Sequence, residues 1–193
     1  PFHLPGAIKL NDALKEGAKE KFTPVEVNKD DIAFLQYTGG TTGVAKGAIL
    51  RHKNILANVE QISAWMIPTL VDRKEIVITP LPLYHIFALT VNFFSFFNKG
   101  SKNILITDPR NIPHFIKEIK NCKFTAMTGV NTLFNAMLNN ADFLRMNFSS
   151  LKVVIAGGMA LQKAVAERWK EGTGMAISEG YGLTETSPVL TAN

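Results

Sequence analysis

Hydrophobic residues in this chain form two kinds of pattern: short continuous runs, and longer stretches in which they recur every three or four positions. The continuous runs are rich in apolar and β-branched side chains, and several are closed by proline or glycine. Such runs are typical of strands whose two faces are both covered. Strands are therefore predicted at residues 32–37, 48–50, 76–79, 104–107, 125–128 and 153–156.

The stretches with helical spacing lie between these runs. Ile55, Val59, Ile62 and Met66 share one face of a helix that Pro68 ends. Strands that alternate with amphipathic helices predict an α/β fold, in which a mostly parallel sheet is flanked by helices on both faces. Further helices are predicted at residues 115–119, 134–138 and 161–169, the last ending at Gly172 or Gly174, and a weaker one at 11–21.

The division into regions follows from where these patterns begin. Residues 1–28 are polar, and we expect them to be a connector from the preceding part of a longer chain, with residues 29–193 forming one incomplete α/β unit. The apolar stretch at 86–97 is shorter than the roughly 20 residues that a membrane span needs. It therefore predicts a core helix or the wall of a ligand pocket. The chain has no initiator methionine, signal peptide or terminating signal, which indicates a piece of a larger protein.

Composition narrows the functional classes. Hydrophobic residues make up 46% and charged residues 19% of the chain, as in folded globular proteins. The net charge of +5 favours anionic small molecules, but no Lys/Arg-rich block predicts nucleic-acid binding. Cys122 is the only cysteine, which excludes an intrachain disulfide and a cysteine metal cluster. We expect a reducing compartment, the cytoplasm.

The most distinctive stretch is 37–48, which lies between two predicted strands. Glycines there let backbone N–H groups turn around an anion, threonine hydroxyls add donors, and Lys46 adds a mobile positive charge. It is not a Walker A loop, because Gly47 rather than Ser or Thr follows Lys46, and no G-x-G-x-x-G is present. A glycine-rich turn without a ligand is the alternative, but the density of these residue types favours a polyphosphate.

Two further motifs follow predicted strands, where ligands of α/β sheets bind. The first is the segment 81–87, which follows Pro80 and in which Pro82 leads into His85 and Phe87; a histidine there is by itself more often structural than catalytic. The second is 157–162, which opens with Gly157 and Gly158 and by itself indicates only a tight turn.

The last motif, 179–188, combines an aromatic ring, a hydroxyl and a carboxylate. These are Tyr181, Thr184 and Glu185. A carboxylate that holds Mg²⁺ is the usual means of neutralising phosphate charge during transfer. The nearby Ser178 approaches the G-x-S-x-G motif of serine hydrolases, but no histidine follows it, so that class is disfavoured.

In this order the four motifs resemble those of the adenylate-forming superfamily, which includes the acyl-CoA synthetases. The usual phosphate loop is an aromatic residue followed by T-S-G-S/T-T-G-x-P-K-G, and this chain differs from it at Gly39 and Ala45. The segments 82–90 and 128–135 resemble bacterial long-chain fatty acid–CoA ligases in particular. The resemblance spans residues 32–188 and implies a central fragment of the large N-terminal domain of such an enzyme.

The resemblance assigns roles to individual residues. It implies catalytic roles for Lys46, Thr184 and Glu185, with Glu185 as the Mg²⁺ ligand, and a substrate pocket that includes His85, Phe87 and Gly157. Phenylalanines beyond Phe87 would extend the wall for a fatty chain. The nucleotide-binding residues that it implies are Tyr37, Thr38, Gly39, Gly40, Thr41, Thr42, Gly43, Val44, Ala45, Lys46, Gly47, Ala48, Gly158, Met159, Ala160, Tyr181, Gly182 and Thr184.

The implied reaction has two steps and uses ATP, Mg²⁺ and CoA. A fatty acid carboxylate attacks the α-phosphate of ATP, giving an acyl-adenylate and pyrophosphate, and the CoA thiol then displaces AMP. The family's C-terminal domain, with its catalytic lysine, lies outside this chain, so nucleotide binding without turnover is the alternative for the fragment alone. The resemblance leaves open the chain-length preference, a homodimer, and peripheral association with the inner face of the membrane.

Overall fold

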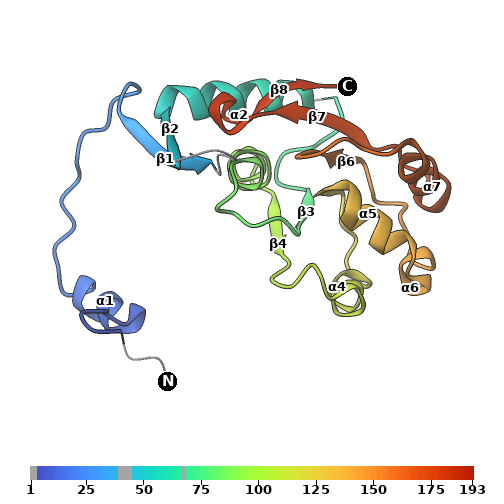
Figure 1. The fold of residues 1–193 in the computed structure, drawn as a ribbon, viewed down its shortest axis with the longest axis horizontal. Helices are drawn as coiled ribbons and strands as arrows, with labels where there is room; N and C mark the ends of the chain where they lie inside the picture. The colour runs from blue at the N-terminus through green and yellow to red at the C-terminus, as the bar shows by residue number, and fades with distance from the viewer. Residues whose placement is uncertain (1–3, 39–44, 67) are drawn as a thin grey trace.

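The computed structural model describes residues 4–38, 45–66 and 68–193. Its centre is a six-stranded sheet in the order β4-β3-β5-β6-β7-β8 (Figure 1). The pairs from β4 to β7 are parallel and β8 runs antiparallel to β7, so the predicted mostly parallel sheet is confirmed. The strands are β3 (Ile76–Thr79), β4 (Lys102–Leu105), β5 (Ala126–Gly129), β6 (Val153–Ala156), β7 (Ser178–Gly182) and β8 (Val189–Ala192).

Helices cover both faces of this sheet, as predicted. Successive strand residues point to opposite faces, so Val77 packs with Ile62 of α2 on one face, whereas Ile78 belongs to the core around Trp169 on the other. The first face carries α2 (His52–Met66), the π-helix η1 (Ala88–Ser95) and α3 (Phe96–Asn98). The second carries α4 (Ile112–Ile119), α5 (Asn131–Leu138), α6 (Ala141–Leu144) and α7 (Lys163–Thr173).

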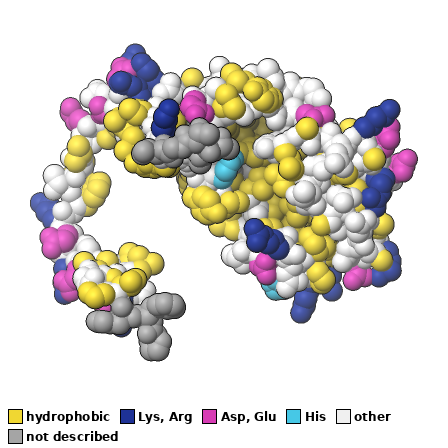
Figure 2. Space-filling model, in the orientation of Figure 1, with side chains coloured by type: hydrophobic (Ala, Val, Ile, Leu, Met, Phe, Trp, Pro, Cys, Tyr) yellow, Lys and Arg dark blue, Asp and Glu magenta, His cyan; other side chains and the backbone are white. Residues whose placement is uncertain are grey.

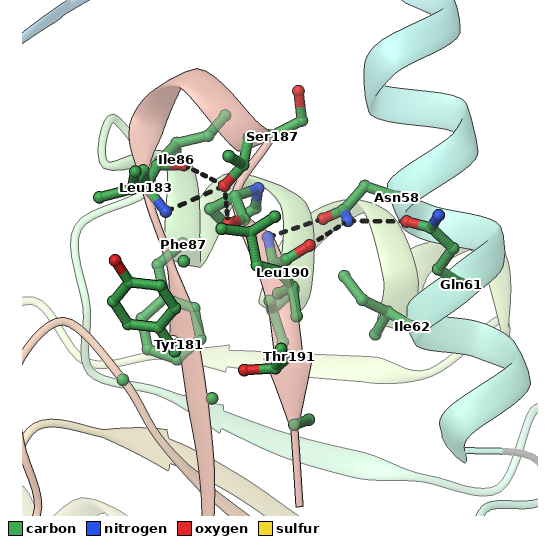
Figure 3. Close-up of a pocket in the computed structure, with 18 of the residues that line it drawn as sticks. Asn58, Gln61, Ile62, Ile86, Phe87, Tyr181, Leu183, Ser187, Leu190 and Thr191 are labelled. Carbon is green, nitrogen blue, oxygen red and sulfur yellow. Dashed lines mark hydrogen bonds between the residues drawn. The ribbon is translucent and has the colours of Figure 1, made fainter.

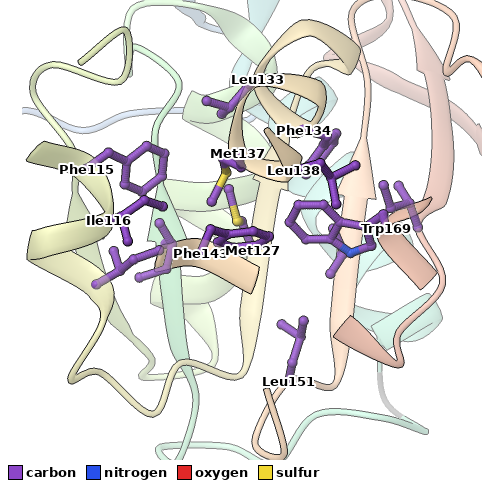
Figure 4. Packing of buried hydrophobic residues seen from close by; sticks show 14 of the residues in the cluster. Phe115, Ile116, Met127, Leu133, Phe134, Met137, Leu138, Phe143, Leu151 and Trp169 are labelled. Carbon is purple, nitrogen blue, oxygen red and sulfur yellow. The ribbon is translucent and has the colours of Figure 1, made fainter. Parts of the chain in front are cut away.

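Aromatic rings fill the larger of the two cores (Figure 4). Trp169 is fully buried, and its ring lies 4.8 Å from that of Phe134 and 5.2 Å from that of Phe143, measured between centroids. Trp169 therefore joins α7 to α5 and α6, and truncating such a side chain typically costs about 3–5 kcal/mol of stability. Gly174, in the left-handed conformation with φ of 75°, ends α7 as predicted.

The strands that flank the glycine-rich stretch form a sheet of their own. β1 (Ile32–Thr38) and β2 (Lys46–Arg51) pair antiparallel, apart from the main sheet. Phe34 and Leu50 point from this hairpin into a small core with Ile86, at the start of the helical segment that becomes η1. The hairpin is thus held against α2 and η1 rather than by the parallel strands.

Several elements differ from the predictions. The strand predicted at 104–107 is β4 at Lys102–Leu105, where it pairs with Ile76–Thr79 of β3. β7 and β8 were not predicted: the glycine and polar residues of β7 lack the apolar signal of a strand, and the short apolar run of β8 was not identified as one. The segment at 86–97 is helical as expected, but most of it is a π-helix.

The N-terminal segment lies away from the sheet (Figure 1). It contains α1 (Leu10–Gly17), and residues 4–31 are exposed throughout. Within the ranges that the structure describes, no helix has the length and apolar character needed to cross a membrane.

Candidate active site

A cleft of about 860 Å³ lies beyond the carboxyl ends of β6 and β7, with α2 and the start of η1 as its other wall. Figure 2 shows hydrophobic side chains within the hollowed face of the molecule. The volume lies within the range of about 300–1,000 Å³ that small-molecule sites occupy. Three of the four sequence motifs meet here, through His85, Phe87, Gly157, Gly158, Tyr181, Gly182, Thr184 and Glu185.

Two glycines shape this cleft by leaving out a side chain. A Cβ atom on Gly157 would lie 2.9 Å from Cε1 of Phe87, so the ring packs directly against the turn after β6. A Cβ atom on Gly182 would lie 2.0 Å from the carbonyl oxygen of Pro188, a distance no folded backbone tolerates. These positions therefore require glycine for close approach, apart from any contact with a ligand.

The turn between β7 and β8 presents the hydroxyl and the carboxylate of the last motif. It contains the 3₁₀ turn η2 (Thr184–Thr186), and Leu183 N–H donates to the carbonyl of Pro188 at 3.1 Å and to Oγ1 of Thr186 at 3.0 Å. The Thr186 hydroxyl also bonds to the Pro188 carbonyl. Thr186 thus stabilises the turn, whereas Thr184 and Glu185 make no side-chain hydrogen bond within the described ranges and face the cleft.

An asparagine on α2 fixes the strand that follows this turn (Figure 3). Asn58 is only 4% exposed; its Oδ1 accepts from Val189 N–H at 3.0 Å, and its Nδ2 donates to the Val189 carbonyl at 2.8 Å. The amide thereby pairs with the start of β8 as a neighbouring strand would. Sequence reasoning missed Asn58; the available signal was a polar residue within the apolar face of α2.

The β1–β2 hairpin contacts segments that border the cleft. Gln36 Nε2 donates to the carbonyl of Tyr84, next to His85, at 2.8 Å, and β2 contacts η2. Lys46 is exposed at the start of β2, and the Thr38 hydroxyl donates to its carbonyl at 3.4 Å. Tyr37, Thr38, Ala45, Lys46, Gly47 and Ala48 are described but do not line the cleft. Gly39, Gly40, Thr41, Thr42, Gly43 and Val44 lie outside the described residues.

The remaining predicted residues lie at the edge of the site. Met159 and Ala160 follow Gly158 on an exposed turn and are not among the residues that line the cleft. Tyr181 is 61% exposed and is one of the residues that line the cleft (Figure 3). An exposed aromatic ring at a strand end offers a stacking surface for a planar ligand.

The described side chains suit a divalent cation only if phosphate oxygens of a substrate supply further ligands. They contain no group of three or more His, Cys, Asp or Glu side chains close enough to hold a metal ion by themselves. Mg²⁺ is usually bound by one or two carboxylates together with substrate phosphates and water. Glu185 supplies such a carboxylate at the cleft, so the donor set suits a cation that arrives with a phosphate ligand.

Comparisons with known proteins agree with this geometry. Residues 4–193 match the AMP-binding enzyme family. The chain is 55% identical over 192 residues to a long-chain-fatty-acid–CoA ligase of Salmonella typhimurium and 54% identical to one of Escherichia coli O157:H7, covering 100% of this chain and 34% of each relative. A ligase of the same description from Bacillus subtilis is 36% identical over 182 residues, which are 93% of this chain and 32% of that one. The chain thus spans about a third of the length of these relatives.

Solved structures share the fold. The anthranilate CoA ligase AuaEII in complex with anthranoyl-AMP superposes with a TM-score of 0.83 at 24% identity, over 100% of this chain and 37% of that one. ATP-bound MatB from Rhodopseudomonas palustris gives a TM-score of 0.74 at 28% identity, over 93% of this chain and 35% of that one. At 24% identity, the similarity to the anthranilate CoA ligase shows a shared fold alone.

Proposed function

This chain belongs to the AMP-binding enzyme family, and from that premise we propose that its parent protein is an ATP-dependent long-chain fatty acid–CoA ligase. The observation that carries the proposal is the meeting of three separate motifs at one cleft, with Thr184 and Glu185 facing the space beside Tyr181. The identity of 51–55% to relatives named long-chain-fatty-acid–CoA ligases supports the substrate class.

In the proposed reaction, the chain binds and orients ATP and the fatty acid. Tyr181 would stack on adenine, with Gly158, Met159 and Ala160 along the base, and Thr184 would donate to the α-phosphate. Lys46 and the threonines of the glycine-rich loop would hold the β- and γ-phosphates and stabilise charge on the leaving pyrophosphate. The carboxylate is itself the nucleophile, so no side chain has to form a covalent bond with substrate.

The apolar part of the cleft is the proposed place for the acyl group. Phe87 and Val91 lie there beyond His85, and Gly157 lets the Phe87 ring pack closely against the turn. Glu185 would hold Mg²⁺, which neutralises phosphate charge when bound. CoA would attack the acyl-adenylate after pyrophosphate has left.

We propose further that residues 1–28 are a connector and that residues 29–193 are part of the large domain, completed by segments outside this chain. The proposed partners are small molecules in the cytoplasm, namely fatty acid, ATP and CoA. Nucleotide binding without turnover is the second candidate for residues 1–193 alone, since the cleft motifs are present but the C-terminal domain is not.

The test is product analysis with the full-length protein. Incubation with ATP, Mg²⁺, CoA and oleate should yield AMP, pyrophosphate and oleoyl-CoA, whereas anthranilate and malonate should react far more slowly. Formation of ADP instead of AMP, or a preference for anthranilate or malonate over oleate, would contradict the proposal. Calorimetric titration of residues 1–193 with ATP then separates the second candidate from a piece that does not bind nucleotide.

A further inference from the structure

A closed ring of hydrogen bonds lies between η1 and the sheet that it covers. Asn92 Nδ2 donates to Oγ1 of Thr79 at 3.0 Å, and the Thr79 hydroxyl donates to Oδ1 of Asn103 at 2.8 Å. Asn103 Nδ2 in turn donates to the backbone carbonyl of Asn92 at 3.1 Å. Each donor of the ring thus meets an acceptor of the next residue, and the ring joins η1 to β3 and β4.

Asn92 is the centre of this arrangement. Its Oδ1 also accepts from the hydroxyl of Thr128 on β5 at 2.9 Å, so one fully buried side chain bonds to two strands of the sheet. Its own carbonyl is held by a third strand through Asn103. A buried polar network in which every member is satisfied fixes one arrangement of its elements, because any other leaves polar groups unpaired.

The element held in this way is a π-helix, whose register is unusual. A π-helix contains one more residue per hydrogen-bonded turn than an α-helix, and such segments are frequent at functional sites. The hydroxyl of Ser95 donates to the Thr90 carbonyl at 2.9 Å, and Asn103 holds the carbonyl of Asn92, so side chains assist the backbone here. Without them, a return to α-helical register would rotate the residues on the amino-terminal side of the segment by about 100° relative to those after it.

Such a rotation would change the wall of the cleft. Val91, next to Asn92, lines the cleft together with Phe87, one turn earlier. Both side chains lie where the proposed acyl group would bind. The bonds of Asn92 to Thr79 and Thr128 therefore decide which side chains of the helix face that group.

We propose that Asn92 is a positioning residue for the acyl group: through Thr79, Asn103 and Thr128 it holds η1 in π-helical register and so sets the chain-length preference of the cleft. This inference rests on the proposed function. Asn92 touches no reacting atom, and its effect passes through Val91 and Phe87.

The chain offers a matched control for this inference. Thr79, Thr90 and Thr128 are at most 1% exposed, but the Thr90 hydroxyl has no hydrogen-bond partner within the described ranges. Thr→Val keeps the shape and replaces the hydroxyl with a methyl group. Thr79→Val and Thr128→Val each leave a polar group of Asn92 without a partner. Thr90→Val breaks no hydrogen bond and leaves no polar group without a partner.

The experiment measures kcat/KM for oleate and for octanoate in the full-length protein, because loss of folded enzyme cancels in their ratio. We expect Thr79→Val and Thr128→Val to change the oleate-to-octanoate ratio by about tenfold, the effect of roughly one methylene in an apolar pocket. Thr90→Val should stay within about twofold of wild type, Thr79→Ser should restore the ratio, and KM for ATP should be unchanged.

Several results would overturn the inference. An unchanged ratio in Thr79→Val and Thr128→Val would show that the ring serves stability alone, and an equal shift in Thr90→Val would show that any lost hydroxyl has this effect. Thr128→Val removes a single bond, so it decides the question if Thr79→Val does not fold. A wild-type protein that makes no acyl-CoA from either acid would refute the proposed function, and the inference with it, whereas an active wild type with unchanged variants refutes the inference only.

Discussion

Two single residues shape the cleft in different ways: Gly157 by having no side chain, and Glu185 by exposing a carboxylate. At Gly157 the missing side chain lets the Phe87 ring approach the backbone, and at Glu185 an exposed carboxylate stands without a protein partner in the described ranges. The first effect is steric and the second electrostatic. They lead to separate predictions.

Gly157→Ala should impair use of the fatty acid. The added Cβ would lie 2.9 Å from the Phe87 ring, which would have to move into the cleft. We expect KM for oleate to rise about tenfold, the typical effect of one methyl group in an apolar pocket, with KM for ATP unchanged. Steady-state kinetics of the full-length protein measure this, and Phe87→Leu in the same chain should partly restore KM. Gly17→Ala is the control, since a Cβ there meets nothing within 4 Å.

Glu185→Gln should abolish most adenylation while leaving the fold intact, because it removes one negative charge at constant shape. We expect kcat for pyrophosphate release to fall about 100-fold, as when one electrostatic contact to the transition state is lost. Excess Mg²⁺ should recover part of the activity. Glu171→Gln on the exposed side of α7 controls for loss of a charge. Wild-type rates in Glu185→Gln would rule out the metal role.

At the scale of elements, the turn that carries Glu185 depends on α2. β7 and β8 have few buried residues of their own, and among the described residues no strand pairs with β8 beyond β7; there the side chain of Asn58 bonds to its first residue. On the side away from β7, β8 is thus bonded only at its first residue, Val189, by the Asn58 amide, as far as the described residues show. The position of the turn should therefore respond to this one side chain.

Asn58→Leu should loosen β8 and weaken nucleotide binding. It leaves Val189 N–H and C=O without partners, and each buried unpaired group costs about 1–3 kcal/mol. We expect faster hydrogen exchange at the Val189 amide and a higher KM for ATP. Asn58→Asp retains an acceptor for Val189 N–H but loses the donor to its carbonyl, so its effect should be intermediate. Equal exchange rates in wild type and Asn58→Leu would contradict the proposed restraint.

For the whole molecule, a buried charge at the amino end of the sheet links segments far apart in sequence. Glu75, 1% exposed, precedes β3; its Oε1 accepts from Lys152 Nζ at 2.7 Å and from Val71 N–H at 2.6 Å. Burial alone would raise the pKa of Glu75, but the hydrogen bonds from Lys152 and Val71 and the charge of Lys152 outweigh it and hold the pKa below its ordinary value of 4.5. The ion pair thus connects β3 to β6.

This depressed pKa predicts the sign of a pH dependence. The stabilisation is fully present above the ordinary value of 4.5 and is lost as pH falls through the lower pKa of the folded state. Glu75→Gln should therefore lower the melting temperature near neutral pH, and the difference from wild type should shrink as pH falls below that value. Thermal unfolding across this range measures it, with Glu171→Gln as control. A difference independent of pH would show that shape, not charge, matters at this site.

The sequence by itself determined the parts of this protein that depend on neighbours along the chain. Short β-branched runs placed β3 and β6 correctly because strand preference and helical periodicity are local, and Gly174 marked the end of α7 for the same reason. The motifs around His85, Gly157 and Glu185 could also be picked out, since each combines its chemistry within a few residues. Their roles stay predictions.

Only the tertiary structure decided what these local pieces form together. β7 carries no apolar pattern, and it exists as a strand because β6 and β8 supply its hydrogen bonds, while Asn58 holds the start of β8. Asn58 and Val189 are 131 positions apart, and Asn92 reaches Thr128 over 36. A polar residue on the apolar face of a helix, such as Asn58, indicates burial but not which residue it bonds. The partners of such residues are set by how helices pack on the sheet, because a hydrogen bond depends on distances in space that a sequence pattern does not contain.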